Sequence, residues 1–158
     1  MSPSSIKPPN SIPWPPLIYL IVILAAIGLK RFWPLGLGGF GLVRLVGCCL
    51  AALALAFDFW AMLTMFRHGT NILPHRAANH LVVDGPFAIS RNPIYVGNTG
   101  VLIGLALGLD NVWLLILAPI AAKFVEILAI QREEAHLQAL FGTVWTNYSA
   151  RVPRWLWP

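Results

Sequence analysis

The chain has 158 residues, of which 58% are hydrophobic and 11% are charged, and its formal net charge is +5. A soluble domain carries roughly 25% charged residues, so this composition excludes an ordinary soluble protein and predicts one integral membrane domain over residues 1–158. Excess basic charge is typical of membrane proteins with a positively charged inner side, and it does not indicate nucleic-acid binding.

Four apolar runs predict membrane-spanning helices, because one crossing needs about 20 apolar residues. The runs cover residues 12–29, 42–66, 94–109 and 112–130. Residues 1–11 are rich in proline and serine and are expected to form a disordered or interfacial lead-in. Only Asp110 and Asn111 separate the last two runs, so residues 94–130 should form a tight helical hairpin. The expected fold is therefore an all-α integral membrane protein with about four transmembrane helices.

Small and charged residues within these runs point to specific contacts. The third run carries glycines at positions 97, 100, 104 and 108, a pattern that favours close packing against another helix. In the second run Asp58 has no obvious local partner, and it either lines a cavity or fixes the packing of its helix. Lys123 and Glu126 are three residues apart on one helix face, so they are expected to pair with each other.

Two polar segments lie at membrane boundaries. The first, Asp-Gly-Pro-Phe-Ala-Ile-Ser-Arg-Asn-Pro-Ile-Tyr-Val-Gly at residues 84–97, combines turn-forming residues with the permanent cation of Arg91. The second begins at Arg132-Glu133-Glu134 and continues the fourth helix as an amphipathic extension that ends at Gly142. The hairpin joins the two segments on one side of the membrane, so they are interpreted as two halves of one site, and residues 67–158 hold its motifs.

The distribution of basic residues predicts the orientation. The side that carries both polar segments holds Lys7, Arg67, Arg76, Arg91, Arg132, Arg151 and Arg154. The other side holds Lys30, Arg31 and Arg44, so the site is expected to face the cytoplasm. The tail after Arg151 mixes arginine with tryptophan and is interpreted as a membrane-interface anchor. His68, His75 and His80 have no cysteine or carboxylate cluster beside them, so no metal site is predicted.

An ordered set of motifs carries a family resemblance. It consists of Asn79-His-Leu-Val-Val-Asp-Gly-Pro-Phe87, Arg91-Asn-Pro-Ile-Tyr-Val-Gly97, Glu133-Glu134, Leu137, Phe141-Gly142, Tyr148 and Arg151-Val-Pro153. This set, which extends over roughly residues 69–153, resembles the isoprenylcysteine carboxyl methyltransferase family, especially its short bacterial members. It is more distantly similar to the membrane phospholipid methyltransferases.

The resemblance implies a membrane methyltransferase that uses S-adenosylmethionine, in a bacterial inner membrane, with the C-terminal segment closing the cofactor pocket. By position, the implied cofactor-binding residues are Asn79, His80, Leu81, Val82, Phe87, Asn92, Pro93, Ile94, Tyr95 and Glu133. The implied acceptor is a lipid or lipophilic small molecule, such as the carboxylate of an isoprenylcysteine-like compound. Ala129 stands where eukaryotic members carry a substrate-contacting arginine, and this departure argues against a prenylcysteine carboxylate.

The residue chemistry agrees with methyl transfer, in which catalysis rests mainly on positioning and electrostatics. The expected catalytic residues are Arg91, Glu133 and Glu134. Arg91 would orient a carboxylate, Glu133 would bind the amine or ribose of the cofactor, and Glu134 would brace Arg91 or Arg132. Two other functions stay open: an NAD(P)H-dependent membrane reductase of a lipid double bond, and a non-catalytic membrane scaffold. The sequence does not predict the oligomeric state.

Overall fold

A computed structural model describes residues 12–38, 41–70 and 80–156 of the chain. Its helices are α1 (Trp14–Phe32), α2 (Gly41–Arg67), η2 (Gly85–Ala88), α3 (Pro93–Gly108), α4 (Val112–Val125), η3 (Glu126–Ile130), α5 (Gln131–Phe141) and α6 (Thr143–Ser149). The described residues form helices and loops, with no strand among them. The prediction of an all-α protein is confirmed.

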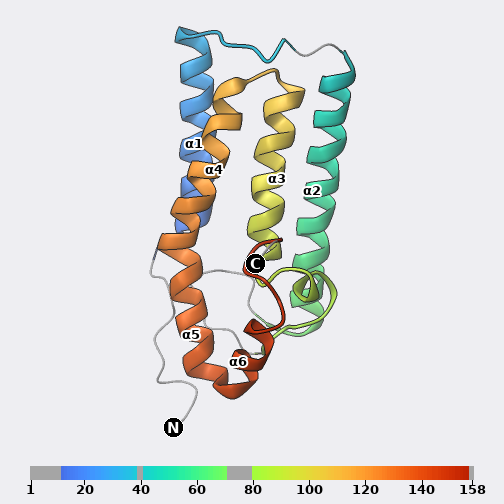
Figure 1. The fold of residues 1–158 in the computed structure, drawn as a ribbon, viewed down its shortest axis with the longest axis vertical. Coiled ribbons are helices and arrows are strands. Elements are labelled where there is room, and N and C mark those ends of the chain that lie inside the picture. Colours follow the sequence, from blue (N-terminus) through green and yellow to red (C-terminus); the bar gives the residue numbers. More distant parts are fainter. Residues whose placement is uncertain (1–11, 39–40, 71–79, 157–158) are drawn as a thin grey trace.

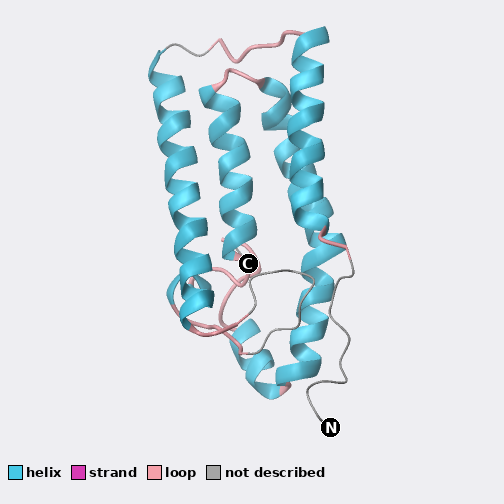
Figure 2. Cartoon of the chain, turned by 180° about the vertical axis from the view of Figure 1, so that it is seen from behind, coloured by secondary structure: helices cyan, strands magenta, loops and turns pink. Residues whose placement is uncertain are grey.

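Helices α1 to α4 lie side by side as an upright bundle, and α5 continues α4 beyond one end of it (Figure 1, Figure 2). Helices α1, α2 and the continuous stretch Val112–Phe141 are each long and apolar enough to cross a membrane. Helix α3 is apolar but has only 16 residues, which gives a length of about 24 Å. The chain is thus an all-helical membrane protein in which three long helices surround a shorter one.

The glycines of α3 allow it to contact α2 at very short range. A Cβ atom on Gly104 would lie 2.5 Å from the backbone nitrogen of Ala51, and one on Gly108 would lie 3.3 Å from Sγ of Cys48. At Gly97 the added atom would collide with the carboxylate of Asp58. The sequence-based prediction of a helix-packing face is confirmed.

This packing predicts that Gly104→Ala destabilises the protein. The added methyl group would meet backbone atoms of α2 rather than a flexible side chain, and such overpacking costs about 1–3 kcal/mol. The matched control is Gly28→Ala in α1, where nothing lies within 4 Å of the added atom and the change should be neutral or stabilising by up to about 1 kcal/mol. Thermal unfolding in detergent, followed by circular dichroism, measures both. Equal melting temperatures for the two variants would contradict the close α2–α3 contact.

A network of polar contacts closes the end of the bundle that lies farthest from the two polar segments. Nζ of Lys30 donates hydrogen bonds to the carbonyl oxygens of Leu109 at 2.6 Å and Asp110 at 3.0 Å. The Asp110 carboxylate accepts a bond of 2.6 Å from the backbone of Leu37, and the Asn111 side chain caps α4. These bonds provide partners for the polar groups of the tight α3–α4 turn, and they hold the connection between α1 and α2 against that turn.

Helix α4 passes into α5 through the π-helical segment η3, whose residues Ala129 and Ile130 are fully buried. A π-helical turn admits an extra residue and changes the face that the following helix presents. Helix α5 ends at Phe141, and Gly142 adopts a positive φ of 52° that turns the chain into α6. The predicted amphipathic extension and its termination at Gly142 are both confirmed.

Candidate functional site

A cavity of about 330 Å³ is lined by residues of η2, α5 and α6, among others. Helices α5 and α6 lie together beyond one end of the bundle (Figure 1). The volume of the cavity is within the range of small-molecule sites, roughly 300–1,000 Å³. Of the residues predicted for the site, those that line this cavity are His80, Leu81, Val82, Phe87, Arg91, Asn92, Pro93, Ile94, Tyr95, Glu133 and Glu134. Asn79 lies outside the described residues. The fold therefore brings the predicted residues from both polar segments to one cavity.

The wall that leads into α3 is held by local backbone geometry. Gly85 begins η2 with a φ of 56°, and a Cβ atom there would lie 3.2 Å from the hydroxyl of Thr64 in α2. The carbonyl oxygen of Phe87 accepts a hydrogen bond of 2.7 Å from the hydroxyl of Tyr148 in α6. Burial raises the pKa of Tyr148, so this hydroxyl keeps its proton and remains a donor. Helix α6 thus holds η2 against the cavity.

A direct bond joins the two polar segments. The hydroxyl of Tyr95 in α3 donates to Oε1 of Glu133 in α5 at 2.8 Å, and both residues line the cavity. Tyr95 is buried, so the bond is largely shielded from solvent. This contact places Glu133 at a fixed depth in the cavity.

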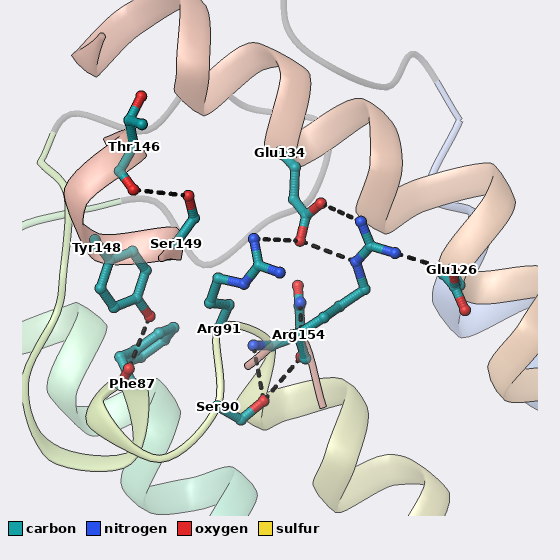
Figure 3. A network of polar contacts seen from close by, with 10 residues as sticks. Phe87, Ser90, Arg91, Glu126, Glu134, Thr146, Tyr148, Ser149 and Arg154 are labelled. Carbon is teal, nitrogen blue, oxygen red and sulfur yellow. Dashed lines mark hydrogen bonds and ion pairs between the residues drawn. The ribbon is translucent and has the colours of Figure 1, made fainter. Parts of the chain in front are cut away.

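Glu134 is the centre of an ion-pair network (Figure 3). Its Oε1 lies 3.2 Å from Nη1 of Arg91 and accepts from Nε of Arg154 at 3.1 Å, while its Oε2 accepts from Nη2 of Arg154 at 2.6 Å. Arg154 also donates through Nη1 to Oε1 of Glu126 at 3.1 Å. Of the two partners expected for Glu134, the structure therefore shows Arg91. A two-pronged contact between arginine and carboxylate is strong and directional.

Arg154 is a residue of this network that the sequence interpretation missed, because the tail was assigned to the membrane interface. Its carbonyl oxygen accepts hydrogen bonds from Oγ of Ser90 at 3.1 Å and Nδ2 of Asn92 at 3.0 Å. The neighbouring carbonyl of Pro153 accepts from the backbone nitrogen of Arg91 at 2.9 Å. The hydrogen bond with Glu134 raises the pKa of Arg154, so its charge is secure. The tail therefore ties residues 90–92 to α5.

Arg154 binds the carboxylates of Glu126 and Glu134, which lie 28 and 20 residues away in the sequence, so no local pattern signalled this contact. Trp155 packs against the apolar core and is not a free interfacial ring. Trp157 lies outside the described residues. Residues 153–155 thus contact the site and the core, a role that the interpretation of the tail as an interface anchor did not include.

Several further cavity residues were not predicted, and two of them, His136 and Trp145, lie close to the predicted groups. His136 lines the cavity one helical turn after Glu133, is buried, and has no hydrogen-bond partner at Nε2 among the described residues. The ring of Trp145 also lines the cavity and lies 5.8 Å from Cζ of Arg91. The spacing of three residues from Glu133 was the available signal for His136.

The remaining histidines and intramembrane charges have different surroundings. His68 pairs with Asp84 at 3.0 Å outside the cavity lining, and His75 lies outside the described residues. The expected pair of Lys123 with Glu126 is present at 3.3 Å. Asp58 is buried between α2 and α3 and does not line the cavity. Within the described ranges, no group of three or more His, Cys, Asp or Glu side chains is placed to hold a metal ion.

A family model described as phospholipid methyltransferase matches residues 42–144 of the chain. This range is more than half of the chain and includes α2, η2, α3, α4 and α5 with the cavity between them. No curated protein and no solved structure matches the chain. The matched range contains both Arg91 and the Glu133-Glu134 pair, and the chain belongs to the phospholipid methyltransferase family of membrane proteins.

Proposed function

We propose that this protein is an S-adenosylmethionine-dependent methyltransferase that modifies a lipophilic acceptor taken from the bilayer. The observation that carries the proposal is the meeting of residues 80–95 and α5 around one cavity, within a chain of a methyltransferase family. The bond from Tyr95 to Glu133 makes this meeting specific, because it joins a residue of each segment.

The cavity residues fit S-adenosylmethionine. Nε of Arg91 is buried without a hydrogen-bond partner among the described residues, so a donor is available for the carboxylate of the cofactor's methionine end. Glu133 offers an acceptor to an amine or a ribose hydroxyl, and the rings of Phe87 and Tyr95 suit adenine and a sulfonium cation. When bound, S-adenosylmethionine supplies a methyl group activated by its positively charged sulfur.

The other proposed cofactor-binding residues shape the walls of the same cavity. They are His80, Leu81, Val82, Asn92, Pro93 and Ile94, together with Asn79, which lies outside the described residues. Glu134 acts behind them by holding Arg91 in place. The Arg91–Glu134 ion pair also gives the cavity fixed charges, and Glu133 adds a hydrogen-bond acceptor beside them. Such fixed charges are the usual means by which enzymes promote displacement reactions.

The acceptor would approach from the bundle side of the cavity. Pro15, Pro16 and Tyr19 of α1, with Met62 and Met65 of α2, line that side. These residues belong to helices long and apolar enough to cross the membrane, so a lipid or lipophilic small molecule suits this entrance. Position 129 supplies no positively charged side chain to pair with the carboxylate of an isoprenylcysteine-like compound, because Ala129 is fully buried and uncharged.

We further propose that the site faces the cytoplasm of a bacterial inner membrane, where a soluble cofactor is available. The described cations at the site end are Arg67, Arg91, Arg132, Arg151 and Arg154, and those at the other end are Lys30, Arg31 and Arg44. The larger number at the site end agrees with the positive-inside rule.

The cavity is less suited to a phosphorylated dinucleotide, which a reductase would need. Among its described lining residues Arg91 is the one arginine or lysine, and Glu134 already neutralises it. Several phosphates would require more cationic partners. A non-catalytic scaffold would not explain why the buried Nε donor of Arg91 has no hydrogen-bond partner at the cavity.

Calorimetric binding to the detergent-purified protein tests the proposal. S-adenosylhomocysteine, the demethylated product form, should bind with micromolar affinity. Glu133→Ala should weaken binding at least about tenfold, because a hydrogen bond to a charged group contributes about 1.5–3 kcal/mol. Lys123→Ala is the control and should leave binding unchanged. The Lys123 side chain is 64% exposed and does not line the cavity.

NADPH titrated in parallel distinguishes the alternatives. Binding of NADPH instead of S-adenosylhomocysteine would overturn the methyltransferase in favour of the reductase. Binding of neither, by protein whose helix content is intact by circular dichroism, would favour the scaffold.

A further inference from the structure

His136 is a buried basic group to which the proposed cofactor site gives no role. It lies on α5, lines the cavity, and is 8% exposed. Its Nε2 is buried and has no hydrogen-bond partner in the described part of the chain. An unpaired nitrogen at such a position costs folding free energy, and unpaired buried polar groups in native proteins often have a functional cause.

His136 is a neighbour of Glu133, a residue proposed to hold the cofactor. The two residues are three apart on α5, so they share a face of the helix and lie about one turn apart along it. Glu133 is already bonded to Tyr95. His136 is therefore free to contact a second molecule in the same cavity.

The ionisable groups around the cavity determine what that second molecule can be. Those lining it, besides His136, are Tyr19 from α1, His80 and Arg91 from the segment before α3, Tyr95 from α3, Glu133 and Glu134 from α5, and Tyr148 from α6. Arg91 is paired with Glu134, and Tyr95 with Glu133. The described lining thus offers no cation without a carboxylate beside it except a protonated histidine. An anionic acceptor would find no fixed positive charge there besides Arg91, which the proposed function assigns to the carboxylate of the cofactor.

We propose that His136 accepts a proton from the methyl acceptor, a proposal that rests on the function proposed above. The acceptor is then a lipophilic molecule whose nucleophilic nitrogen, oxygen or sulfur carries a hydrogen. A carboxylate acceptor arrives without this proton and gives such a base nothing to do. Histidine suits the role because it exchanges a proton near neutral pH.

The proposed step balances. The hydrogen on the nucleophile X moves to Nε2 of His136, and the electron pair left on X forms the new X–C bond to the methyl group. The bond between the methyl carbon and sulfur breaks at the same time, and its electron pair stays on sulfur, which becomes a neutral thioether. His136, now positively charged, returns its proton to water after the product leaves.

Methyl transfer to four probes with matched long chains tests the proposal: dodecylamine, dodecanethiol, a long-chain alkylphenol and dodecanoic acid. We expect the wild type to methylate at least one of the three proton-bearing probes and not dodecanoic acid. His136→Gln should lower kcat for that probe about a hundredfold. Its affinity for S-adenosylhomocysteine should stay within about twofold of the wild type. His68→Gln, at an exposed histidine outside the cavity lining, is the matched control and should have wild-type kinetics.

A second readout is independent of turnover. The histidine rings are isotopically labelled, and the NMR signal of His136 is identified by its loss in His136→Gln. With S-adenosylhomocysteine bound, this signal should shift when the reactive probe is added, whereas the His68 signal should not. Wild-type turnover by His136→Gln, preferential methylation of dodecanoic acid, or a His136 signal unmoved by all three proton-bearing probes would each overturn the proposal. Failure of the wild type to bind S-adenosylhomocysteine would instead overturn the proposed function, so the two failures are distinguishable.

Discussion

Replacement of Glu134 by alanine is expected to lower the free energy of unfolding by at least about 3 kcal/mol and to weaken S-adenosylhomocysteine binding strongly. Glu134 is the common partner of Arg91 and Arg154, and its side chain is only 14% exposed. Its removal leaves two guanidinium groups close together without their shared counter-charge. Removing one partner of a buried ion pair costs about 3–5 kcal/mol, mostly because the remaining charge stays desolvated.

The binding defect should follow from the structural one. Without Glu134, Arg91 loses its ion pair and Arg154 keeps only its bond to Glu126. Arg91 would then turn toward water, and the cavity would lose the donor proposed for the cofactor's carboxylate. Calorimetry measures the affinity, and chemical denaturation in detergent measures the free energy of unfolding.

Two controls identify the cause. Glu134→Gln keeps an oxygen acceptor and removes the charge, so it should fall between wild type and Glu134→Ala. Lys123→Ala removes one partner of Glu126, which keeps its contact with Arg154, and should change stability much less than Glu134→Ala does. A Glu134→Ala protein with wild-type stability and affinity would show that the network has no energetic role.

The membrane helices could be predicted from the sequence because lipid imposes a simple requirement. A spanning segment must satisfy its own backbone and present apolar side chains, and those runs are visible in the chain. The predicted run 112–130 coincides with α4 and η3, which together cover residues 112–130. The α3–α4 turn was equally clear, because Asp110 and Asn111 are the polar residues available there.

The polar site was predictable only where ordered motifs marked it. Arg91, Tyr95, Glu133 and Glu134 all line the cavity, and each belongs to a motif of the quoted set. Arg154 was missed because its contacts reach across 20 to 64 residues, and no local pattern specifies such distant partners. The π-helical segment η3 is also invisible in the sequence, since its residues Glu126–Ile130 continue the helical pattern on both sides.

The residues of the site fall into two groups: those that line the cavity, and those that hold the lining residues in place. Arg91 and Glu133 line the cavity, whereas Arg154 and Ser90 do not. The second pair instead fixes the first, through the ion pair at Glu134 and the bonds at residues 90–92. Precise positioning is what a displacement reaction requires of its enzyme, so the tail should affect binding without touching the ligand.

A chain that ends at Ala150 is accordingly expected to lose S-adenosylhomocysteine binding by at least about a thousandfold while keeping most of its helix content. The truncation removes the carbonyl acceptors of buried Ser90 and Asn92 and the ion-pair partner of Glu134. The backbone nitrogen of Arg91 also loses its acceptor, the carbonyl of Pro153. Each of these four unsatisfied groups costs about 1–3 kcal/mol, so together they cost at least about 4 kcal/mol, which corresponds to a thousandfold change in affinity. The α2–α3 contact lies outside the removed segment, so the bundle should persist.

Two further variants separate the contributions of backbone and side chain. A chain that ends at Leu156 keeps every described contact of the tail and should bind as the full chain does. Arg154→Ala keeps the carbonyl that Ser90 and Asn92 use but loses the ion pairs with Glu134 and Glu126. Its affinity should therefore lie between those of the two truncated chains. Calorimetry measures the affinity of each variant, and circular dichroism on the same preparations measures its helix content. Normal binding by the chain that ends at Ala150 would show that the tail does not position the site. If Arg154→Ala binds as weakly as the chain that ends at Ala150, the side chain of Arg154 accounts for the whole effect.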